Sequence, residues 1–298
     1  MTTPDLQKSD FKVGSLKRNP ASPRTLFGLI MSGIAGLFTL LAIVPLFIIL
    51  TYLITKGISS LSASVFTELP PPPLVEDGGF GNAILGTVIM VGIGALISVP
   101  LGIMAAIYLS EFNEGKAGEW IRFATNVLSG VPSIIVGVFA YGAVVLTFKN
   151  YSAWAGGFAL AILMLPIIVR TTDESLKLVP QDVRQASVGV GANRYQTVLQ
   201  IVLPAALPAI ITGITLSVAR AAGETAPLLF TALFTQFWPN WDNLLVEPTA
   251  SLAVLVYSFA IVPFKNQQEL AWGAAFILVI LVLLTSIISR LATAKRTY

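Results

Sequence analysis

The chain has 298 residues, of which 55% are hydrophobic and only 11% are charged. Soluble domains carry about 25% charged residues, so this composition indicates an integral membrane protein. The sequence contains no cysteine, which excludes disulfides and thiolate metal sites, and no histidine, which removes the usual neutral-pH base. The formal net charge of +3 is weak evidence for nucleic-acid binding, because Lys and Arg in a membrane protein chiefly set the topology.

Six apolar stretches are long enough to cross a bilayer as helices, which takes about 20 residues each. In chain order they are Thr25–Thr55, Gly78–Ser110, Phe123–Phe148, Asn150–Val169, a stretch that begins near Ala205, and Leu270–Ser289. A polar tail, residues 1–25, precedes the first stretch, which is too long for the apolar part of a signal peptide. Pro248–Phe264 is short and has a proline near its end. We interpret it as an interfacial or extracytoplasmic helix, within an extracytoplasmic loop at residues 236–268.

The positions of Lys and Arg support six spans with both termini in the cytoplasm. In that topology the outside loops hold only Lys56, Lys149 and Lys265, one arginine lies within a span, and all other Lys and Arg residues are inside. This is the asymmetry that the positive-inside rule requires. The prediction is therefore an all-α integral membrane protein with six transmembrane helices, a cytoplasmic tail at 1–25 and a membrane domain at 26–298 whose core is 83–290.

The cytoplasmic segment between the fourth and fifth spans, residues 179–204, predicts two short helices joined at a corner. Pro180 can occupy the first turn of a helix over QDVRQASV. The glycines of 189–191 interrupt it, because glycine readily adopts the positive φ of a helix end. Asn193 can cap a second helix, which we expect to end at Leu203–Pro204. Such a knob is either an amphipathic hairpin on the membrane or a docking element for a cytoplasmic partner.

The fifth span contains two charged residues, Arg220 and Glu224, in the sequence SVARAAGETAPLLF. Charges at bilayer depth are costly and mark functional sites by default. Residues four apart share a face of a helix. Arg220 lies 16 residues beyond Pro204, about 24 Å along a helix, so we expect the pair near the middle of the bilayer. The pair is either an ion pair that neutralises itself within the bundle or an anion-handling site on a translocation path.

The 179–204 segment resembles the coupling loop of the membrane subunits of ABC importers. That loop has the pattern EAA, three residues, Gly, nine residues, Ile, one residue, Leu-Pro. Two residues depart from it: Gln185 stands where glutamate is usual, and Ser187 replaces the second alanine. A charged contact from position 185 to an ATPase is therefore in question, while the corner is kept. The ATPase-coupling residues that the resemblance implies are Gln185, Ala186, Ser187, Gly191, Arg194, Ile201, Leu203 and Pro204.

Four other stretches are similar to the PstA-type permeases of phosphate ABC importers. They are GGFGNAILGT (78–87), SGVPSIIVGVFAY (129–141), VLPAALPAIITGI (202–214) and ARAAGETAPLLFTALF (219–234). The resemblance runs from about Phe27 to Leu291, and GETAPL is its most discriminating part. It implies a type I ABC importer permease fold and a multi-pass subunit of a prokaryotic plasma membrane.

The resemblance also implies a complex. A PstA-type and a PstC-type permease form the membrane pair, two PstB-type ATPase subunits bind inside, and a PstS-type phosphate-binding protein docks outside. The chain has no GxxxxGK[ST] phosphate loop, so ATP and Mg²⁺ are expected on the partner ATPase, with no cofactor and no catalysis in this subunit. The alternatives are a permease for sulfate or another oxyanion, a proton-coupled secondary transporter, and a scaffold that does not transport.

With a phosphate substrate, the expected pathway residues acquire roles. Arg220 offers planar donors that suit phosphate oxygens. Phosphate still carries a P–OH group at neutral pH and sulfate does not, so Glu224 can accept that proton, orient the arginine and disfavour sulfate. Thr225, Ser129 and Ser133 can add hydroxyl donors, although a serine within a span more often bonds to a helix carbonyl.

Overall fold

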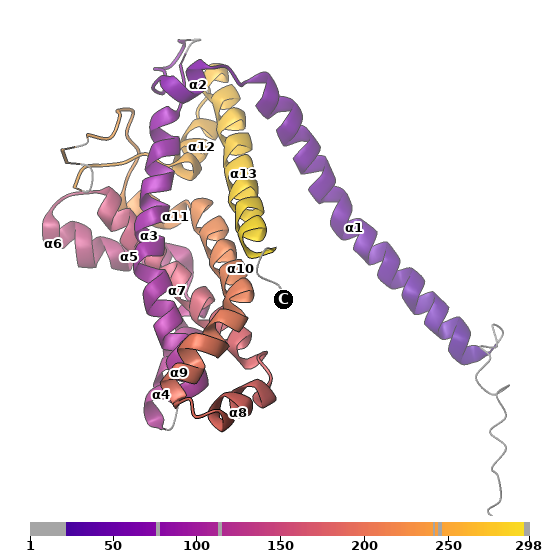
Figure 1. The fold of residues 1–298 in the computed structure, drawn as a ribbon. Coiled ribbons are helices and arrows are strands. Elements are labelled where there is room, and N and C mark those ends of the chain that lie inside the picture. The colour runs from indigo at the N-terminus through magenta and orange to yellow at the C-terminus, as the bar shows by residue number, and fades with distance from the viewer. Residues whose placement is uncertain (1–21, 76–77, 113–114, 241, 244–245, 295–298) are drawn as a thin grey trace, which may run out of the picture. The chain divides into compact units, whose positions relative to one another are not determined.

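The computed structural model describes residues 22–75, 78–112, 115–240, 242–243 and 246–294. All regular secondary structure in these ranges is helical, which confirms the all-α prediction (Figure 1). Five helices are long and apolar enough to cross a membrane, and a bent pair of helices supplies a sixth span if it is counted as one. The five are Pro23–Ser59, Gly81–Phe112, Ala153–Lys177, Arg194–Ala222 and Lys265–Leu291.

The chain divides into two compact units, residues 1–52 and 53–298. In the first unit the described residues belong to α1 (Pro23–Ser59), whose side chains in this unit are almost all exposed and mainly apolar. An apolar surface around a helix of this length suits lipid. Most of the predicted tail, residues 1–25, lies outside the described residues.

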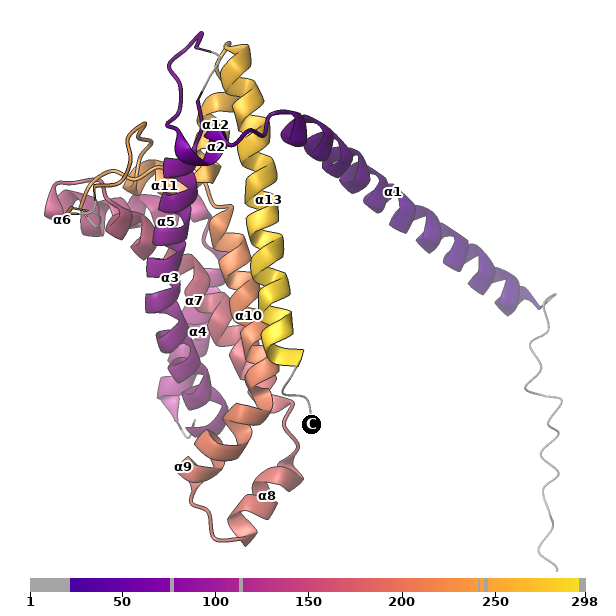
Figure 2. The same cartoon turned by 45° about the horizontal axis from the view of Figure 1, so that its top comes forward.

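The second unit is a helical bundle whose central pair is α3 (Gly81–Ile107) and α7 (Ala153–Lys177), which lie side by side (Figures 1 and 2). Glycines allow these helices to approach closely. A Cβ atom at Gly102 would lie 2.7 Å from Ile168 Cγ2, and one at Gly157 would lie 2.5 Å from Ile93 Cγ2. Small residues bring helices together in lipid because backbone packing drives association there. The α3–α7 pair is therefore the rigid centre of the unit.

Three buried clusters follow the bundle from end to end. Following the predicted topology, we call the end with α8 (Gln181–Gly189) and α9 (Arg194–Thr197) the inner end. The end with α2 (Ser64–Thr67) and α12 (Leu252–Ala260) is the outer end (Figure 1). Phe80, Leu252 and Leu255 belong to the outer cluster. The central and inner clusters are made of Met90, Leu160, Met164, Ile168, Ala221 and Leu228, and of Leu176, Val179, Val202, Ala206 and Ile210.

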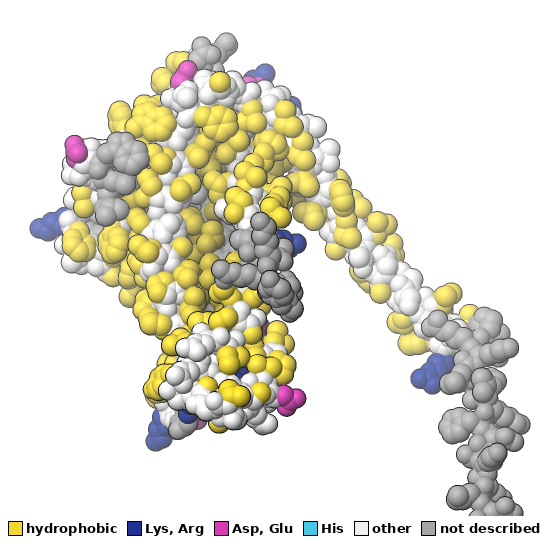
Figure 3. Space-filling view, viewed as in Figure 1, with side chains coloured by type: hydrophobic (Ala, Val, Ile, Leu, Met, Phe, Trp, Pro, Cys, Tyr) yellow, Lys and Arg dark blue, Asp and Glu magenta, His cyan; other side chains and the backbone are white. Residues whose placement is uncertain are grey.

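Hydrophobic side chains cover much of the visible side of the second unit over α3 and α13 (Lys265–Ala294), and acidic and basic side chains are few there (Figure 3). This surface suits lipid or another membrane subunit rather than water. It agrees with the integral membrane class that the composition predicts.

The third predicted span is not straight. It consists of α4 (Lys116–Gly130) followed by α5 (Ser133–Ala140), η3 (Tyr141–Val145) and α6 (Leu146–Phe148), with a bend of 106°. The continuous stretch Phe123–Phe148 was therefore the wrong description. The break has a local cause: Pro132 disfavours the helical conformation in the preceding residue, and Val131 is extended with φ −75° and ψ 127°.

The fifth predicted span is also broken. Helix α10 (Leu203–Ala222) ends before Gly223, and the chain resumes as the short helix α11 (Ala226–Thr231). Helix α11 lies against α5, where a Cβ atom at Gly137 would lie 2.6 Å from Pro227 Cα. At the other end of α11, Ser152 N–H donates to the carbonyl of Thr231 at 3.0 Å. Helix α11 therefore packs against α5 within a few residues of both breaks, and its other end meets Ser152, the residue that caps α7.

The ambiguous segment Pro248–Phe264 forms a nine-residue helix, α12 (Leu252–Ala260), capped by Ser251, whose side chain accepts from Val254 N–H. Nine residues are too few to cross a bilayer. The segment is therefore a short helix that does not span, while its extracytoplasmic placement stays a prediction. Its buried side chains pack in the outer cluster beside α3 and α13.

Candidate functional site

The predicted knob between α7 and α10 is present as two short helices joined at a corner. They are α8 (Gln181–Gly189) and α9 (Arg194–Thr197), with Pro180 as the residue that caps α8. Gly191 has φ +92°, a conformation that strongly favours glycine. The Asn193 side chain accepts from Gln196 N–H, and the Gln196 side chain accepts from Asn193 N–H, both at 2.9 Å. This reciprocal capping box starts the second helix as expected.

The second helix of the knob does not end at Leu203–Pro204, so that expectation is wrong. It continues from α9 through η4 (Val198–Val202) into α10 as one helix of 29 residues, Arg194–Ala222. The turn η4 is π-helical, and Leu203 N–H bonds to the carbonyl of Val198. A wider turn before a proline removes the need for its missing donor and relieves its clash with the preceding carbonyl. The knob is thereby directly continuous with the fifth span.

Ser187, a departure from the coupling-loop pattern, has a role inside the knob. Its Oγ lies 2.9 Å from Thr197 Oγ1, and both residues are buried. Thr197 in turn donates to the Asn193 carbonyl at 3.1 Å, so Ser187 fastens α8 to the start of α9. The other residues at the EAA place, Gln185 and Ala186, are exposed and free to meet a partner.

The remaining predicted coupling residues divide in the same way. Gly191, Arg194 and Pro204 are exposed, and Ile201 and Leu203 are half-buried beneath the knob. Large apolar side chains are also exposed at this inner end, where the predicted topology places water rather than lipid. They are Leu178, Val183, Val188, Val190, Tyr195 and Leu199. An exposed apolar patch of this kind is typical of a protein–protein contact.

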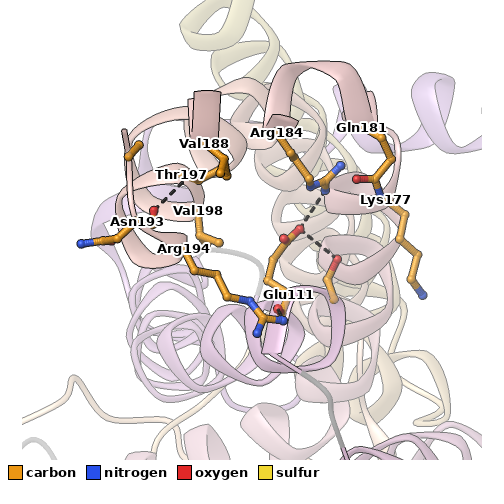
Figure 4. A pocket seen from close by; sticks show the side chains of 11 residues that line it. Glu111, Lys177, Gln181, Arg184, Val188, Asn193, Arg194, Thr197 and Val198 are labelled. Atoms are coloured by element: carbon orange, nitrogen blue, oxygen red, sulfur yellow. Dashed lines mark hydrogen bonds and ion pairs between the residues drawn. The ribbon is translucent and has the colours of Figure 1, made fainter. Parts of the chain in front are cut away.

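The knob is attached to the inner end of α3 by residues that the sequence patterns did not single out. Helix α3 continues into a π-helical turn, η2 (Tyr108–Phe112). Glu111 in this turn accepts from Arg184 of α8, with 2.8 Å between Oε1 and Nη2 (Figure 4). Both side chains are largely buried, with 15% of Arg184 and 11% of Glu111 exposed. Arg184 also donates to the carbonyls of Leu176 (2.9 Å) and Val179 (2.5 Å) at the end of α7.

Helix α9 holds the same turn from the other side. Arg194 donates to the backbone carbonyl of Glu111, and its guanidinium lies 5.1 Å from the ring centroid of Phe112. Tyr195 stacks on Phe112 with 5.0 Å between centroids. A cavity of about 690 Å³ remains between η2 and the knob, with Glu111, Arg184 and Arg194 in its wall (Figure 4).

A second charged cluster fastens α4 to α7 at the inner end. Asp173 of α7 accepts from Arg122 at 3.0 Å and from Lys177 at 2.5 Å. Arg122 also donates to the carbonyl of Leu109 in η2, at 3.2 Å. Basic side chains thus donate hydrogen bonds to backbone carbonyls of η2, as they often do at the C-terminus of a helix.

The predicted pathway pair lies at the break between α10 and α11. Arg220 is in the last turn of α10, and Glu224 follows the end of that helix, so the expectation of one continuous helical face is wrong. The two side chains still meet, with 3.5 Å between Arg220 Nε and Glu224 Oε1, the limit of a hydrogen bond. The arginine is 62% exposed and the glutamate 15% exposed.

The three predicted hydroxyl donors have different surroundings. Ser129 Oγ donates to the carbonyl of Thr125 at 2.8 Å, the common role of a serine within a span. Ser133 begins α5, and Thr225 precedes α11, so both lie at the adjoining breaks. Within the described parts of the chain, none of the three hydroxyls bonds to Arg220 or Glu224.

Comparison with known proteins gives a family match over most of the chain. Residues 98–297 match the family described as "Binding-protein-dependent transport system inner membrane component". The chain is 41% identical over 246 residues to the "Phosphate transport system permease protein PstA" of Yersinia pestis, covering 82% of both chains. It is 42% identical over 263 residues to the protein of the same name from Haemophilus influenzae, covering 88% of this chain and 92% of that one.

A more distant relative comes from an archaeon. It is the "Probable phosphate transport system permease protein PstA" of Methanocaldococcus jannaschii, 33% identical over 252 residues, which are 84% of this chain and 88% of that protein.

Solved structures share the fold at low sequence identity. A chain of the inward-facing MetNI methionine ABC transporter aligns with a TM-score of 0.59 at 18% identity, over 72% of this chain and 95% of that chain. A chain of a bacterial alginate ABC transporter in complex with its substrate-bound periplasmic protein aligns with a TM-score of 0.62 at 11% identity, over 91% and 96%. These matches show that this chain has the fold of ABC importer membrane subunits. Together with the sequence relatives, they show that the chain belongs to the binding-protein-dependent transport system inner membrane components, and within them to the PstA-type permeases.

Proposed function

We propose that this chain is the PstA-type permease subunit of an ATP-driven importer of inorganic phosphate. It forms the translocation pathway with a second permease and is coupled to a separate ATPase through residues 179–204. The phosphate transport system permeases among its relatives support phosphate as the substrate. The structural observation that carries the proposal is the exposed guanidinium of Arg220 at a helix break within an apolar span.

The depth of this break supports a place on the pathway. Ala221, next to Arg220, is buried in the central cluster, between the outer cluster and the inner one. An arginine at that depth with 62% of its side chain exposed cannot face lipid without a large energetic penalty. It therefore faces water in a pathway or a polar group of the second permease.

The two adjoining breaks add a favourable field for an anion. Glu224 lies just before the start of α11, and α11 packs against α5 at Pro227 and Gly137. The start of a helix carries partial positive charge, and broken helices in transporters direct such ends at anionic groups. Because Glu224 is only loosely bonded to Arg220, the arginine can exchange this partner for a phosphate oxygen while the carboxylate accepts the P–OH proton. A site of this kind holds its ion weakly enough to release it.

The proposed partners follow from this assignment. They are a PstC-type permease, two PstB-type ATPase subunits that meet the exposed apolar and EAA-position residues of the knob, and a PstS-type binding protein on the outer face. ATP and Mg²⁺ bind to the ATPase, and this chain contributes no cofactor and no catalytic group. The coupling knob is the observation that speaks against a proton-coupled secondary transporter, which needs no such loop.

The test is labelled phosphate uptake at low phosphate in cells that lack this subunit but keep its partners. The wild type should restore uptake that excess sulfate does not inhibit. Arg220→Gln should lower that uptake at least tenfold, about 1.4 kcal/mol or more, at an unchanged membrane level. Arg170→Gln is the matched control, because Arg170 forms an exposed ion pair with Glu174 at 3.1 Å and should retain uptake. Uptake of sulfate instead of phosphate would show that the substrate is another oxyanion.

A further inference from the structure

Resting on the proposed function, we propose that Glu111 and Arg184 are positioning residues for coupling. Their ion pair locks the ATPase-facing knob to α3, and α3 carries the displacement of the knob to the loop 235–252 at the outer end. The coupling loop then acts on the outer face through α3 as well as through α10, with which it is continuous.

At the inner end of α3, basic side chains from three other helices gather around the five-residue turn η2. Arg122 from α4, Arg184 from α8 and Arg194 from α9 all contact η2. The pair Arg184–Glu111 is the part of this cluster that joins α8 to α3 through two largely buried charges. A buried ion pair adds little net stability over apolar residues, but losing one partner leaves an uncompensated charge. Such a pair is suited to fixing the geometry between two elements.

The body of the link is a long helix that contains Pro100 and packs closely against α7. Helix α3 and η2 form one span of 32 residues, Gly81–Phe112, about 48 Å long. Gly94, Gly102 and Gly157 allow it to pack against α7 with almost no space between them. Closely packed helices move as a unit because side chains in such an interface cannot slide without losing contacts. A displacement at η2 therefore moves the outer end of α3.

The outer end of α3 holds the loop 235–252 at both of its ends. Asn82 Nδ2 donates to the carbonyls of Thr235 at 3.1 Å and Phe237 at 3.2 Å. Thr87 Oγ1 accepts from Leu252 N–H at 2.9 Å, where α12 begins. These bonds span more than 150 residues in sequence. Helix α3 thus bonds to the coupling knob at one end and to the outer loop at the other.

This arrangement makes a reciprocal prediction. If the binding protein loaded with its ion presses on the outer loop, α3 should shift the position of the knob. The rate of ATP hydrolysis by the ATPase should then change as well. Loss of the Glu111–Arg184 pair should uncouple the two faces while both remain assembled.

The test uses the complete complex of this chain with its partner permease and ATPase in proteoliposomes. We measure ATP hydrolysis with and without the loaded binding protein, and the number of ions transported per ATP. Glu111→Gln should reduce the stimulation by the loaded binding protein at least fivefold and lower the ions moved per ATP, the scale of an ordinary allosteric coupling. Glu111→Asp, which keeps the charge, should restore part of the stimulation. Glu174→Gln, in an exposed ion pair, is the control and should behave as the wild type.

A double variant distinguishes coupling from general damage. Glu111→Gln together with Arg184→Gln should be no worse than either single variant in ions moved per ATP, because the two residues act as one unit. If the assembled complexes of Glu111→Gln keep the wild-type stimulation and stoichiometry, the proposal is wrong, even when fewer complexes assemble.

The link also has a readout that does not depend on the substrate. This chain contains no cysteine, so spin labels can be attached through Asp182→Cys in the knob and Leu96→Cys on α3, both exposed, with cysteine-free partner subunits. The distance between them should stay constant through the nucleotide cycle and change in Glu111→Gln. A distance that changes equally in both backgrounds overturns the proposal. A wild type that transports only sulfate would overturn the proposed substrate and leave this comparison valid.

Discussion

The knob at the inner end and the break at Arg220 are both charged regions of an apolar chain, but they hold their charges differently. In the knob, Arg184 is 15% exposed, forms a 2.8 Å ion pair and donates to two further carbonyls. At the break, Arg220 is 62% exposed and meets Glu224 at 3.5 Å. Arg184, with all of these bonds, can hold two helices in a fixed position. Arg220, with one long bond, remains available to a mobile anion.

The largest effect should come from forcing the two breaks apart. A side chain at Gly137 would meet Pro227 Cα at 2.6 Å and its carbonyl oxygen at 3.2 Å, and backbone atoms cannot move aside as a flexible side chain can. Gly137→Leu should therefore separate α5 from α11 and abolish phosphate uptake in the cell assay, while ATP hydrolysis by the assembled complex continues. Overpacking of this kind costs about 1–3 kcal/mol.

Gly142→Leu is the matched control, since nothing lies within 4 Å of a Cβ at Gly142, in η3 of the same broken span. This variant should transport normally. Equal loss in both variants would mean that the broken span tolerates no larger side chain, and that the contact between α5 and α11 has no special role.

Local chemistry explains which parts of this fold could be predicted from sequence. The capping box at Asn193 and the positive φ of Gly191 depend on residues within a few positions, so the corner of the knob was predictable. The number of spans followed from the lengths of the apolar stretches. The bend at Val131 had a usable signal as well, because Pro132 restricts the residue before it.

The features that were missed are one tertiary contact and two helix ends. Glu111 and Arg184 are 73 residues apart, and neither lies in a pattern that predicts an ion pair. Leu203–Pro204 looked like the end of a helix, because a proline usually stops one, but the π-helical turn η4 lets the chain continue. The end of α10 at Ala222 places Glu224 outside the helix on which it was expected. The ion pair is decided by tertiary packing, whereas the other two outcomes concern how the backbone behaves next to Pro204 and Gly223.

A medium effect is expected at the break itself. Glu224→Gln removes the carboxylate that orients Arg220 and accepts the P–OH proton, but keeps the size of the side chain. Phosphate uptake should fall about fivefold, and excess sulfate should now inhibit it, since a charge-assisted hydrogen bond contributes roughly twice as much as a neutral one. Glu269→Gln, which alters an exposed pair with Lys265 at 3.8 Å, should change neither property. Normal uptake that sulfate still fails to inhibit would rule out the role of Glu224 in selectivity.

The smallest effect should come from Asn193→Ala in the knob. The substitution removes the side-chain acceptor for Gln196 N–H, and loss of an N-cap costs about 1 kcal/mol. Amide hydrogen exchange at residues 194–196 should therefore rise about fivefold in the assembled complex, while Gln185→Ala, at an exposed position of α8, leaves it unchanged. Uptake should fall by less than twofold, because Arg184, Arg194 and the Ser187–Thr197 bond still hold the knob to η2 and to itself. If Asn193→Ala instead lowers uptake as much as Arg220→Gln, the knob depends on its own helix caps rather than on its attachment to α3. The contrast between a fixed coupling end and an open ion-handling break would then no longer hold.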